Sequence, residues 1–280
     1  MDIQVAVCGA GTMGSGIAQV FAQNAFPVIL FDLDSGALSR AAEAIEKNLD
    51  YLLKKNKISS REKTEIINRI QFTSDLGDCV AFLIVEAIVE DLTAKVDLLK
   101  QLALVNNEEV IFASNTSSLS ITKLQEQVDF PERIAGMHFF NPAYIMPLVE
   151  IVEGLHTCSE VVRELQEICA AIGKQPVVCK DAPGFVVNRV ARPYYLQSLR
   201  LAQEGVAGFE EIDSILESVG FRMGPFRLMD LIGIDINLKT SETVYEALGR
   251  PARLHPSVLQ QQKVGSGMLG RKSGEGFYKY

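Results

Sequence analysis

The feature that most constrains the fold of this sequence is a glycine pattern near its start. Gly9-Ala10-Gly11-Thr12-Met13-Gly14 follows a short apolar run at residues 3–8 and opens a helical stretch at 14–24. Asp32 ends the next apolar run, 27–32. A G-x-G-x-x-G turn between a strand and a helix, with an acidic residue closing the following strand, is typical of a dinucleotide-binding βαβ unit.

The three glycines have separate roles in such a unit. Gly9 permits a tight turn, Gly11 lets a pyrophosphate approach the backbone, and Gly14 lets the helix pack closely on the strand. The first helical residues, Thr12 and Met13, offer N–H groups and the positive end of the helix dipole to phosphates. The sequence therefore predicts a nucleotide site here, with a glycine-rich turn that binds nothing as the alternative.

The acidic residues after the second apolar run bear on which dinucleotide binds. A carboxylate at Asp32 can accept both ribose hydroxyls and repels a 2′-phosphate. Asp34 adds a second negative charge, and the first basic residue of the chain is Arg40. NAD is therefore favoured over NADP, unless Asp32 is only a solvated residue at a strand end.

Strand-like and helical stretches alternate along the first part of the chain. Residues 36–70 form a long, lysine-rich helical stretch, too long for an ordinary crossover, which predicts a helical hairpin inserted after the second strand. The alternation predicts a doubly wound, Rossmann-like α/β sheet. Its parallel strands are expected where the chain is apolar on both faces, at residues 3–8, 27–32, 82–88 and 109–114.

The later part of the chain changes character. After Gly184 the strand pattern stops, so we expect an α/β domain over residues 1–182 and a smaller all-α domain over 183–280. The first helix of the second domain contains Pro193, which predicts a kink near Arg192. Further strands are expected at 133–139, 148–153 and 175–180. Helices are expected at 159–172 (capped by Ser159), 185–204, 210–219 and 257–264, with one or two more over 226–248.

Composition and charge exclude several classes of protein. The net charge of -8 argues against binding to nucleic acid or to an anionic membrane surface. The chain has no apolar run of about 18 residues that would predict a membrane span, and no basic residue precedes Arg40 as a secretory signal requires. The five scattered cysteines include no C-x-x-C pair, so we expect free thiols, no metal and a cytoplasmic location.

Two residues in the middle of the chain fit acid–base chemistry. His138, one of three histidines, ends a predicted strand at the sheet edge where α/β proteins bind ligands. Glu150 lies in the next strand, and a strand–loop–strand return would bring its carboxylate to the imidazole and fix the tautomer of a base. The alternative is a structural histidine at a strand end.

Polar residues at two other places are candidates for substrate contact. Asn188 lies in the first turns of the second domain's first helix, where its amide can reach a substrate carbonyl or face solvent. The run Ser114-Asn115-Thr116-Ser117-Ser118 follows a predicted strand and can contact substrate or nicotinamide. Its competing explanation is capping of the next helix by Ser118 or Ser120.

Eight motifs are spread along nearly the whole chain. In order they are VAVCGAGTMGSGIA, IVEAIVED, ASNTSSLSI, MHFFNP, LVEIVEG, DAPGFVVNR, MGPFRLMDLIGID and GRKSGEGFYKY. In this order and spacing the chain resembles the 3-hydroxyacyl-CoA dehydrogenase family, in its short bacterial form, the 3-hydroxybutyryl-CoA dehydrogenases. The resemblance implies NAD-dependent, reversible oxidation of an L-3-hydroxyacyl-CoA thioester, with 3-hydroxybutyryl-CoA favoured, and a homodimer formed through the helical domain.

The same resemblance assigns roles to residues. It implies that His138 is the catalytic base and Glu150 its orienting partner, and it puts Ser117 and Asn188 at the 3-oxygen and thioester of the substrate. It places Asp32 at the adenine ribose. The other cofactor contacts that it implies are Ala87, Glu90, Lys95, Ser117 and, near the nicotinamide, Asn141.

The inserted helices gain a role from the resemblance as well. In the family a helix pair after the second strand forms one wall of the coenzyme A groove. Lys54, Lys55 and Lys57 lie on that segment and can meet the phosphates of coenzyme A, with a solvated charged face as the alternative.

Some segments depart from the common family pattern and leave the acyl group open. Pro147 stands where the family commonly has Lys, and Ala143-Tyr144-Ile145-Met146 replaces Val-Pro-Val-Met. The segments RPYY, PFRLMDLIG and PSVLQQQ resemble a branch that includes 3-hydroxyadipyl-CoA dehydrogenases of aromatic catabolism. A dicarboxylic acyl chain needs a cation at the end of its pocket, for which the candidates are Arg189, Arg192, Arg222 and Arg227.

Two other classes of protein remain as alternatives. β-Hydroxyacid dehydrogenases also pair a Rossmann domain with a helical one, but they resemble one another in relying on a catalytic lysine. The MHFFNP segment of this chain disfavours that class. A crystallin-like relative would keep the fold and bind nucleotide without turnover, which the complete set of polar candidates disfavours.

Overall fold

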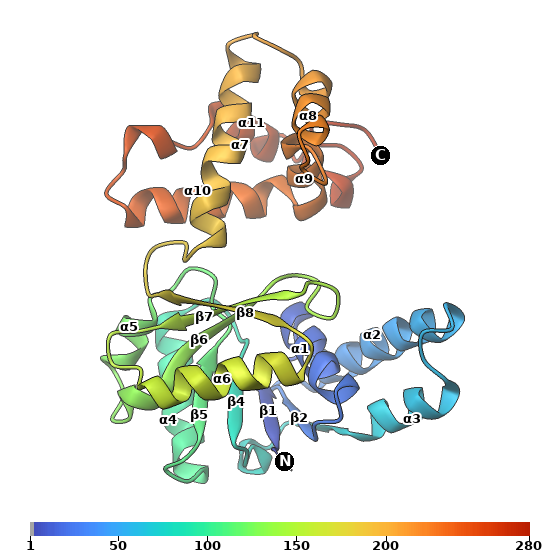
Figure 1. The fold of residues 1–280 in the computed structure, drawn as a ribbon, viewed down its shortest axis with the longest axis vertical. Helices are drawn as coiled ribbons and strands as arrows, with labels where there is room; N and C mark the ends of the chain where they lie inside the picture. Colours follow the sequence, from blue (N-terminus) through green and yellow to red (C-terminus); the bar gives the residue numbers. More distant parts are fainter. Residues whose placement is uncertain (1–2) are drawn as a thin grey trace. The chain divides into compact units, whose positions relative to one another are not determined.

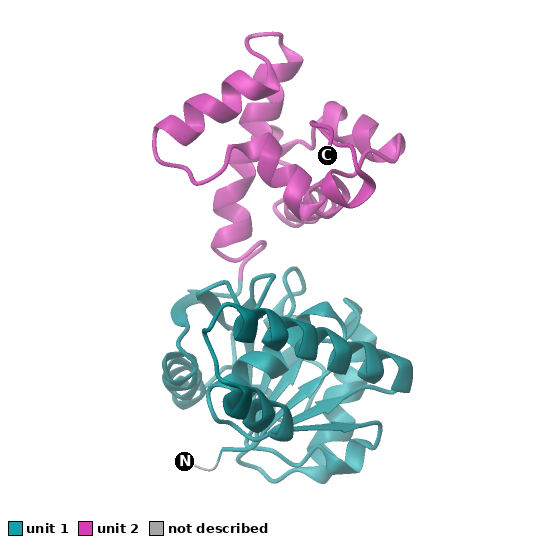
Figure 2. Ribbon diagram, turned by 90° about the vertical axis from the view of Figure 1, so that its right-hand side faces the viewer, with its two compact units in different colours: residues 1–181 teal, residues 182–280 magenta. Residues whose placement is uncertain are grey.

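The computed structural model describes residues 3–280, which form two compact units. Unit 1 ends at Asp181 and unit 2 begins at Ala182, as the two colours of Figure 2 show. Unit 1 combines one sheet with helices, and unit 2 is helical. The predicted fold class is confirmed.

Unit 1 is built on an eight-stranded sheet in the order β3-β2-β1-β4-β5-β6-β7-β8. The first six strands of the chain are parallel, β7 is antiparallel to β6, and β8 is parallel to β7. The C-terminal ends of β1, β4, β5 and β6 therefore share one edge, where doubly wound sheets bind ligands. The strands are β1 (Val5–Cys8), β2 (Val28–Phe31), β3 (Ile70–Thr73), β4 (Leu83–Glu86), β5 (Ile111–Ser114), β6 (Ile134–Phe139), β7 (Leu148–Glu153) and β8 (Gln175–Lys180).

Helices cover both faces of the sheet because its inner strands are apolar on both sides. α1 (Thr12–Gln23), α2 (Ser35–Lys54) and α6 (Ser159–Ala171) share one core with alternate strand residues such as Val7 and Leu30. α6 crosses in front of the strands in the view of Figure 1. α4 (Leu92–Val105) and α5 (Ile121–Gln125) bury side chains outside that core, on the opposite face.

The inserted hairpin consists of α2 and α3 (Ser60–Asn68), which extend away from the sheet beside β3 (Figure 1). Ser59 and Glu62 form a reciprocal capping box that fixes the start of α3. Strand β3, directly after α3, was not predicted, because it lies at the sheet edge and only its first and last residues are buried.

Unit 2 begins with α7 (Val187–Gln203), which contains Pro193. Its core includes Tyr195, Leu199 and Phe226. The span expected at 226–248 is two helices, because Gly233 interrupts it with a φ of +104°. The remaining helices are α8 (Phe209–Ser218), α9 (Pro225–Ile232), α10 (Ile234–Ala247) and α11 (Val258–Gly265). Within residues 3–280, short 3₁₀ turns lie at Leu76–Asp78, Pro131–Arg133, Ala252–Leu254 and Arg271–Ser273.

Two local predictions can be judged directly. The expected cap of α6 by Ser159 is wrong: Cys158 occupies the N-cap position, and no side chain caps this helix. All five cysteines are free thiols, as predicted. Among residues 3–280, no helix is long and apolar enough to span a membrane.

Candidate active site

The glycine turn after β1 has the geometry that a bound pyrophosphate requires. Gly9 adopts a φ of +107°, and a Cβ there would lie 2.5 Å from the carbonyl oxygen of Ala87. A Cβ on Gly14 would lie 1.7 Å from the carbonyl oxygen of Gly9, so α1 can approach β1 only with glycine at this position. Gly11 is exposed at the N-terminus of α1, and a Cβ there would meet nothing within 4 Å.

The N-terminus of α1 also has backbone N–H groups that no side chain caps. No side chain caps the helix at Gly11, so the first N–H groups, at Thr12 and Met13, point outward from an uncapped end. Positive partial charge at such an end favours a phosphate. The turn thus fits a dinucleotide in both shape and charge.

Asp32 stands immediately after β2, beside this turn. Its carboxylate accepts hydrogen bonds from the N–H of Ala10 (2.7 Å) and of Asp34 (2.9 Å). Arg40 lies closer than its sequence position suggested, because α2 brings its guanidinium to 3.0 Å from the Asp34 carboxylate. Hydrogen bonds from Arg40 and from the Gly36 N–H hold the pKa of Asp34 below its usual value. The second negative charge that Asp34 adds is therefore paired with Arg40, the first basic residue of the chain, whereas Asp32 forms no ion pair with any residue in 3–280.

A buried ionic cluster lies at the ends of β4 and β5. Lys95 of α4 is 1% exposed, and its Nζ lies 2.6 Å from Glu86 Oε1 and 3.2 Å from Glu90 Oε2. Glu86, fully buried, also accepts the Ser114 hydroxyl (2.6 Å). We call Glu86, Glu90 and Lys95 the β4 cluster; it ties the ends of two parallel strands to the first turn of α4.

Glu90 extends this cluster into the polar run after β5. Its Oε1 accepts the hydroxyls of Thr116 (2.5 Å) and Ser118 (2.8 Å) and the N–H of Ser117 (3.3 Å). Partial burial opposes ionisation, but the charge of Lys95 and these hydrogen bonds outweigh it and lower the pKa of Glu90. The Ser117 side chain is exposed, and its hydroxyl makes no hydrogen bond to any residue that the structure describes.

Helix capping in this segment falls to Ser120, which accepts the N–H of Lys123 at the start of α5. Of the two serines that the sequence offers as caps, Ser118 and Ser120, only Ser120 caps the helix. Ser118 turns to Glu90 instead, and Asn115 accepts the N–H of Phe139 (2.9 Å), joining the ends of β5 and β6.

His138 and Glu150 meet directly across the antiparallel pair of β6 and β7. They are register partners, and His138 Nδ1 lies 2.7 Å from Glu150 Oε2. His138 is 6% exposed and Glu150 0%. Because the carboxylate accepts from Nδ1, the neutral imidazole carries its lone pair on Nε2.

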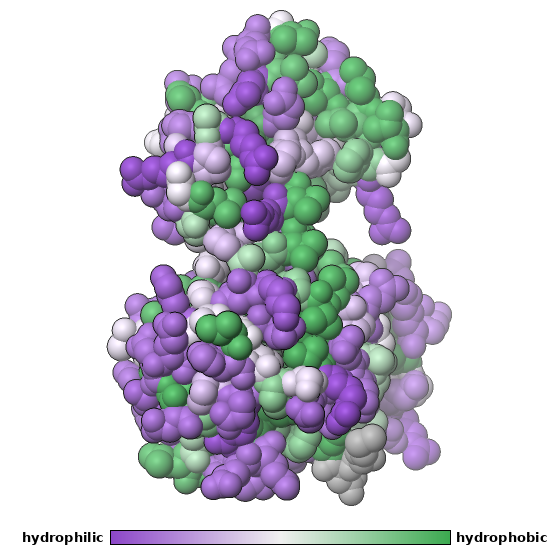
Figure 3. All heavy atoms as spheres, turned by 60° about the vertical axis from the view of Figure 1, so that its left-hand side comes forward, coloured by the Kyte–Doolittle hydropathy of each residue, from purple (hydrophilic) through white to green (hydrophobic). Residues whose placement is uncertain are grey.

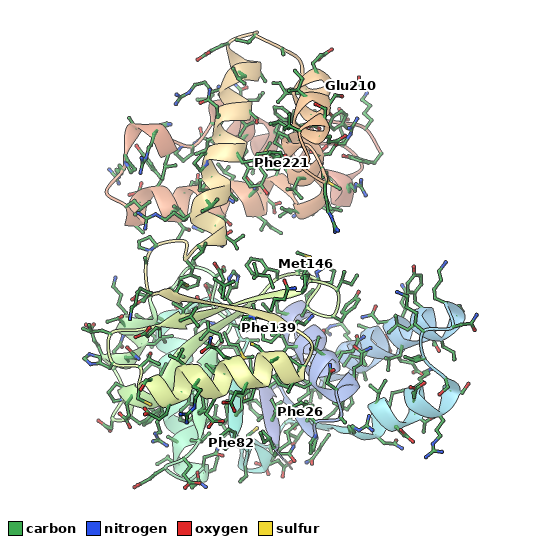
Figure 4. The ribbon with its side chains drawn as sticks, in the orientation of Figure 1. Phe26, Phe82, Phe139, Met146, Glu210 and Phe221 are labelled. Atoms are coloured by element: carbon green, nitrogen blue, oxygen red, sulfur yellow. The ribbon has the colours of Figure 1, made fainter. Side chains whose placement is uncertain are left out.

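The loop between these strands, residues 140–147, includes Asn141 and, on its outer part, Met146 (Figure 4). Lys174, in the turn between α6 and β8, donates to the carbonyl oxygens of Ala143 (2.6 Å) and Met146 (2.8 Å) in this loop. Burial lowers the pKa of Lys174. Asn141 is exposed, as a side chain that contacts a ligand must be.

The remaining predicted residues lie farther along the chain or at the hairpin. Asn188 is in the first turn of α7, in unit 2, and is partly exposed. Lys54 ends α2, and Lys55 and Lys57 follow it; all three are exposed and form no ion pair with any residue in 3–280. They are available to an anionic ligand.

Both parts of the chain match models of one protein family. Residues 4–182 match the model described as 3-hydroxyacyl-CoA dehydrogenase, NAD binding domain, and residues 184–280 match its C-terminal domain. The chain belongs to the 3-hydroxyacyl-CoA dehydrogenase family. Its members are NAD-dependent oxidoreductases, and NAD is the cofactor of this chain.

Relatives of known name agree with this membership. A 3-hydroxyadipyl-CoA dehydrogenase of Escherichia coli is 44% identical over 99% of this chain, which spans only 58% of that relative's length. A probable 3-hydroxybutyryl-CoA dehydrogenase of Deinococcus radiodurans is also 44% identical, over 98% of this chain and 99% of its own.

Solved structures show the same fold. The 3-hydroxybutyryl-CoA dehydrogenase of Escherichia coli K12 superposes with a TM-score of 0.96 at 44% identity, covering 100% of this chain and 60% of that one. The (S)-3-hydroxybutyryl-CoA dehydrogenase of Ralstonia eutropha has a TM-score of 0.95 at 36% identity, covering 100% of this chain and 99% of its own.

Several site residues escaped the reasoning from sequence. Glu86 interrupts the apolar run LIVE, and a charge at the end of a buried strand was the signal that could have drawn attention to it. Lys174 carried no such signal, because a lysine in a turn becomes a site residue only through its distant partners, the carbonyl oxygens of Ala143 and Met146.

Proposed function

We propose that this protein oxidises an L-3-hydroxyacyl-CoA to the 3-oxoacyl-CoA, reversibly, with NAD as the hydride acceptor. The observation that carries the proposal is the buried contact of 2.7 Å between His138 and Glu150 at the ligand-binding edge of the sheet. Membership of the family supports the acyl-CoA class of substrate.

His138 takes the proton of the 3-hydroxyl on Nε2, and Glu150 stabilises the imidazolium that results. NAD, when bound, accepts the hydride that leaves carbon 3 of the substrate, the carbon that bears this hydroxyl. Ser117 and Asn188 donate hydrogen bonds to the substrate oxygens and so favour the developing negative charge. The exposed Ser117 hydroxyl is consistent with this role.

The cofactor contacts follow the site described above. The turn at Gly9–Gly14 receives the pyrophosphate, Asp32 the adenine ribose, and Asn141 the nicotinamide side. The β4 cluster and Ala87 line the same edge of the sheet. Lys54 and Lys55 meet the phosphates of coenzyme A by charge attraction, since both are exposed and unpaired within residues 3–280.

We also infer a homodimer in the cytoplasm, formed through unit 2. Apolar side chains gather on part of this unit's surface in the view of Figure 3. Large exposed apolar residues of unit 2 include Phe221, Leu231, Ile232, Ile236 and Val258. Contiguous exposed apolar surface of this kind is typical of protein interfaces.

The test compares two histidine variants in an NADH absorbance assay with acetoacetyl-CoA. His138→Gln keeps a donor for Glu150 but removes the base, and we expect kcat to fall by about 10²–10⁴-fold while NADH still binds. His156→Gln, the same change at an exposed histidine of unit 1, should leave kcat unchanged. Near-normal turnover by His138→Gln would overturn the assignment, and tight NADH binding without turnover of any thioester by the unchanged protein would favour a non-catalytic relative.

The acyl group is the finer question. The sequence favours 3-hydroxybutyryl-CoA, whereas similar relatives carry the names of both 3-hydroxybutyryl-CoA and 3-hydroxyadipyl-CoA enzymes. The two substrates differ in chain length and in one terminal carboxylate, so a cation placed for that carboxylate would separate them.

A further inference from the structure

Unit 2 buries a positive charge that no acidic residue neutralises. Arg192 of α7 is 3% exposed, yet it forms no ion pair with any residue in 3–280. Its Nη1 donates to the carbonyl oxygen of Asn237 (3.0 Å) and to the Ser241 hydroxyl (2.8 Å), and its Nε donates to the carbonyl oxygen of Asn188 (3.0 Å). These neutral acceptors orient the guanidinium without cancelling its charge.

The surroundings of Arg192 confirm that its charge is uncompensated. Burial lowers its pKa to about 10, and the nearby Tyr195, whose ring lies 5.0 Å from the guanidinium carbon, is the group that opposes this shift. Arg192 is therefore still protonated near neutral pH. A buried cation without an anion destabilises a protein unless some other function retains it.

One nitrogen of this guanidinium is still available. Nη2 makes no hydrogen bond to any described residue, and it is not among the fully buried polar atoms that lack a hydrogen bond. The small exposed area of Arg192 thus includes Nη2. A guanidinium held by Nε and Nη1 with Nη2 open is oriented to receive a carboxylate.

The other candidate arginines do not combine these properties. Arg227 lies 3.3 Å from Glu217, so its charge is already matched. Arg189 and Arg222 are exposed, where hydration and salt screening weaken any discrimination between charged and neutral ligands.

The position of Arg192 relative to Asn188 indicates what the anion is. The two residues are four apart on α7, so they share a face with about 5–6 Å between their Cβ atoms. In the proposed function Asn188 contacts the reacting end of the substrate. In a six-carbon dicarboxylic chain the terminal carboxylate lies three carbons beyond the 3-hydroxyl carbon, a separation on the same scale.

We propose that Arg192 binds the terminal carboxylate of a short dicarboxylic acyl chain and so selects 3-hydroxydicarboxylyl-CoA thioesters over neutral ones. This inference rests on the proposed 3-hydroxyacyl-CoA dehydrogenase function. It adds a specificity residue to the substrate site and places the dicarboxylic class ahead of 3-hydroxybutyryl-CoA.

The test measures kcat/KM for a matched pair of thioesters, L-3-hydroxyadipyl-CoA and L-3-hydroxyhexanoyl-CoA. These differ only in a carboxylate or a methyl group at the sixth carbon. The unchanged protein should prefer the adipyl substrate by about 100-fold or more, because a desolvated charge pair loses much of its affinity when one partner is missing. Equal kcat/KM values would overturn the inference while leaving the proposed function intact, whereas no turnover of either would contradict the proposed function.

Variants then assign the preference to Arg192. Arg192→Met should lose about 100-fold in kcat/KM for the adipyl substrate and keep the value for the hexanoyl substrate. Arg192→Lys retains the charge with fewer donors and should fall between. Arg200→Met, the same change at an exposed arginine of α7, should leave both values unchanged. An undiminished adipyl preference in either folded Arg192 variant would overturn the assignment.

Discussion

Lys95 in unit 1 and Arg192 in unit 2 are both almost fully buried basic side chains, and the groups around them differ in charge. In unit 1, Lys95 is 1% exposed and lies within 3.2 Å of two carboxylates, Glu86 and Glu90. In unit 2, Arg192 is 3% exposed, and its partners are two carbonyl oxygens and a hydroxyl. Burial is the same, but only the first charge is matched by residues of the chain.

The difference separates a structural ion cluster from a binding group. Lys95 holds together strand ends that must stay fixed for the cofactor turn to keep its shape, so its counter-charges belong to the chain. A group that binds an anionic ligand must leave its counter-charge to that ligand. Neutral acceptors serve such a group well, because they orient the guanidinium and do not compete as anions.

Lys95→Met should give the largest loss of stability. Removing the amine leaves Glu86 fully buried beside Glu90 without a cation, and breaking a buried ion pair costs about 3–5 kcal/mol. Urea denaturation of the variant measures the free energy of unfolding. Lys100→Met changes an exposed lysine on the same helix and is the control. A loss below about 1 kcal/mol for Lys95→Met would show that the β4 cluster is not a structural ion cluster.

Arg192→Met should destabilise the protein much less, by about 1 kcal/mol. The Asn237 carbonyl oxygen keeps the Ser241 hydroxyl as a donor (3.0 Å), and a net buried charge disappears. The same urea experiment, with Arg200→Met as its control, measures the difference. A loss as large as that of Lys95→Met would mean that Arg192 is matched as fully as Lys95, which would remove the contrast between the two units.

Glu90→Gln should have the smallest effect, and one that depends on pH. The pKa of Glu90 is lowered in the folded protein, so its carboxylate contributes stability above the pKa of the unfolded chain, about 4.3, and loses it as pH falls through the folded value. The Tm of the variant should therefore lie slightly below that of the unchanged protein at pH 6 and approach it below about pH 4. Glu126→Gln controls for the loss of one surface charge at pH 6. A Tm difference that grows on acidification would contradict this sign.

Most of the sheet could be predicted because its strands are apolar on both faces, a pattern that no surface element shares. Strand β3 was missed because it lies at the edge and is only half buried. Ser159 was taken for a cap because serine is common there, but its hydroxyl bonds to Glu160 instead and the helix begins one residue after Cys158. Residue preferences indicate which residues can occupy an N-cap, but tertiary contacts determine where the helix begins.

The candidate site divides in the same way. The glycine turn and the pairing of His138 with Glu150 follow from local motifs and from the return of one strand beside another. The β4 cluster does not, since Glu86 and Ser114 meet only after two strands pair. The burial of Arg192 was also invisible, because a helix with Pro193 in it gives no local reason to bury the arginine beside it.

The pairing of β6 with β7 also limits how the protein can be altered. Side chains alternate between the faces of a sheet, so a slip of one residue in this pair would send His138 and Glu150 to opposite sides. The length of the loop at residues 140–147 sets the register of this pair. Lys174 donates hydrogen bonds only to main-chain carbonyl oxygens in the loop, so these contacts do not depend on the side chains there. Substitutions in this loop other than at Asn141 can therefore adapt it to new substrates, whereas an insertion or deletion would shift the register of β6 and β7.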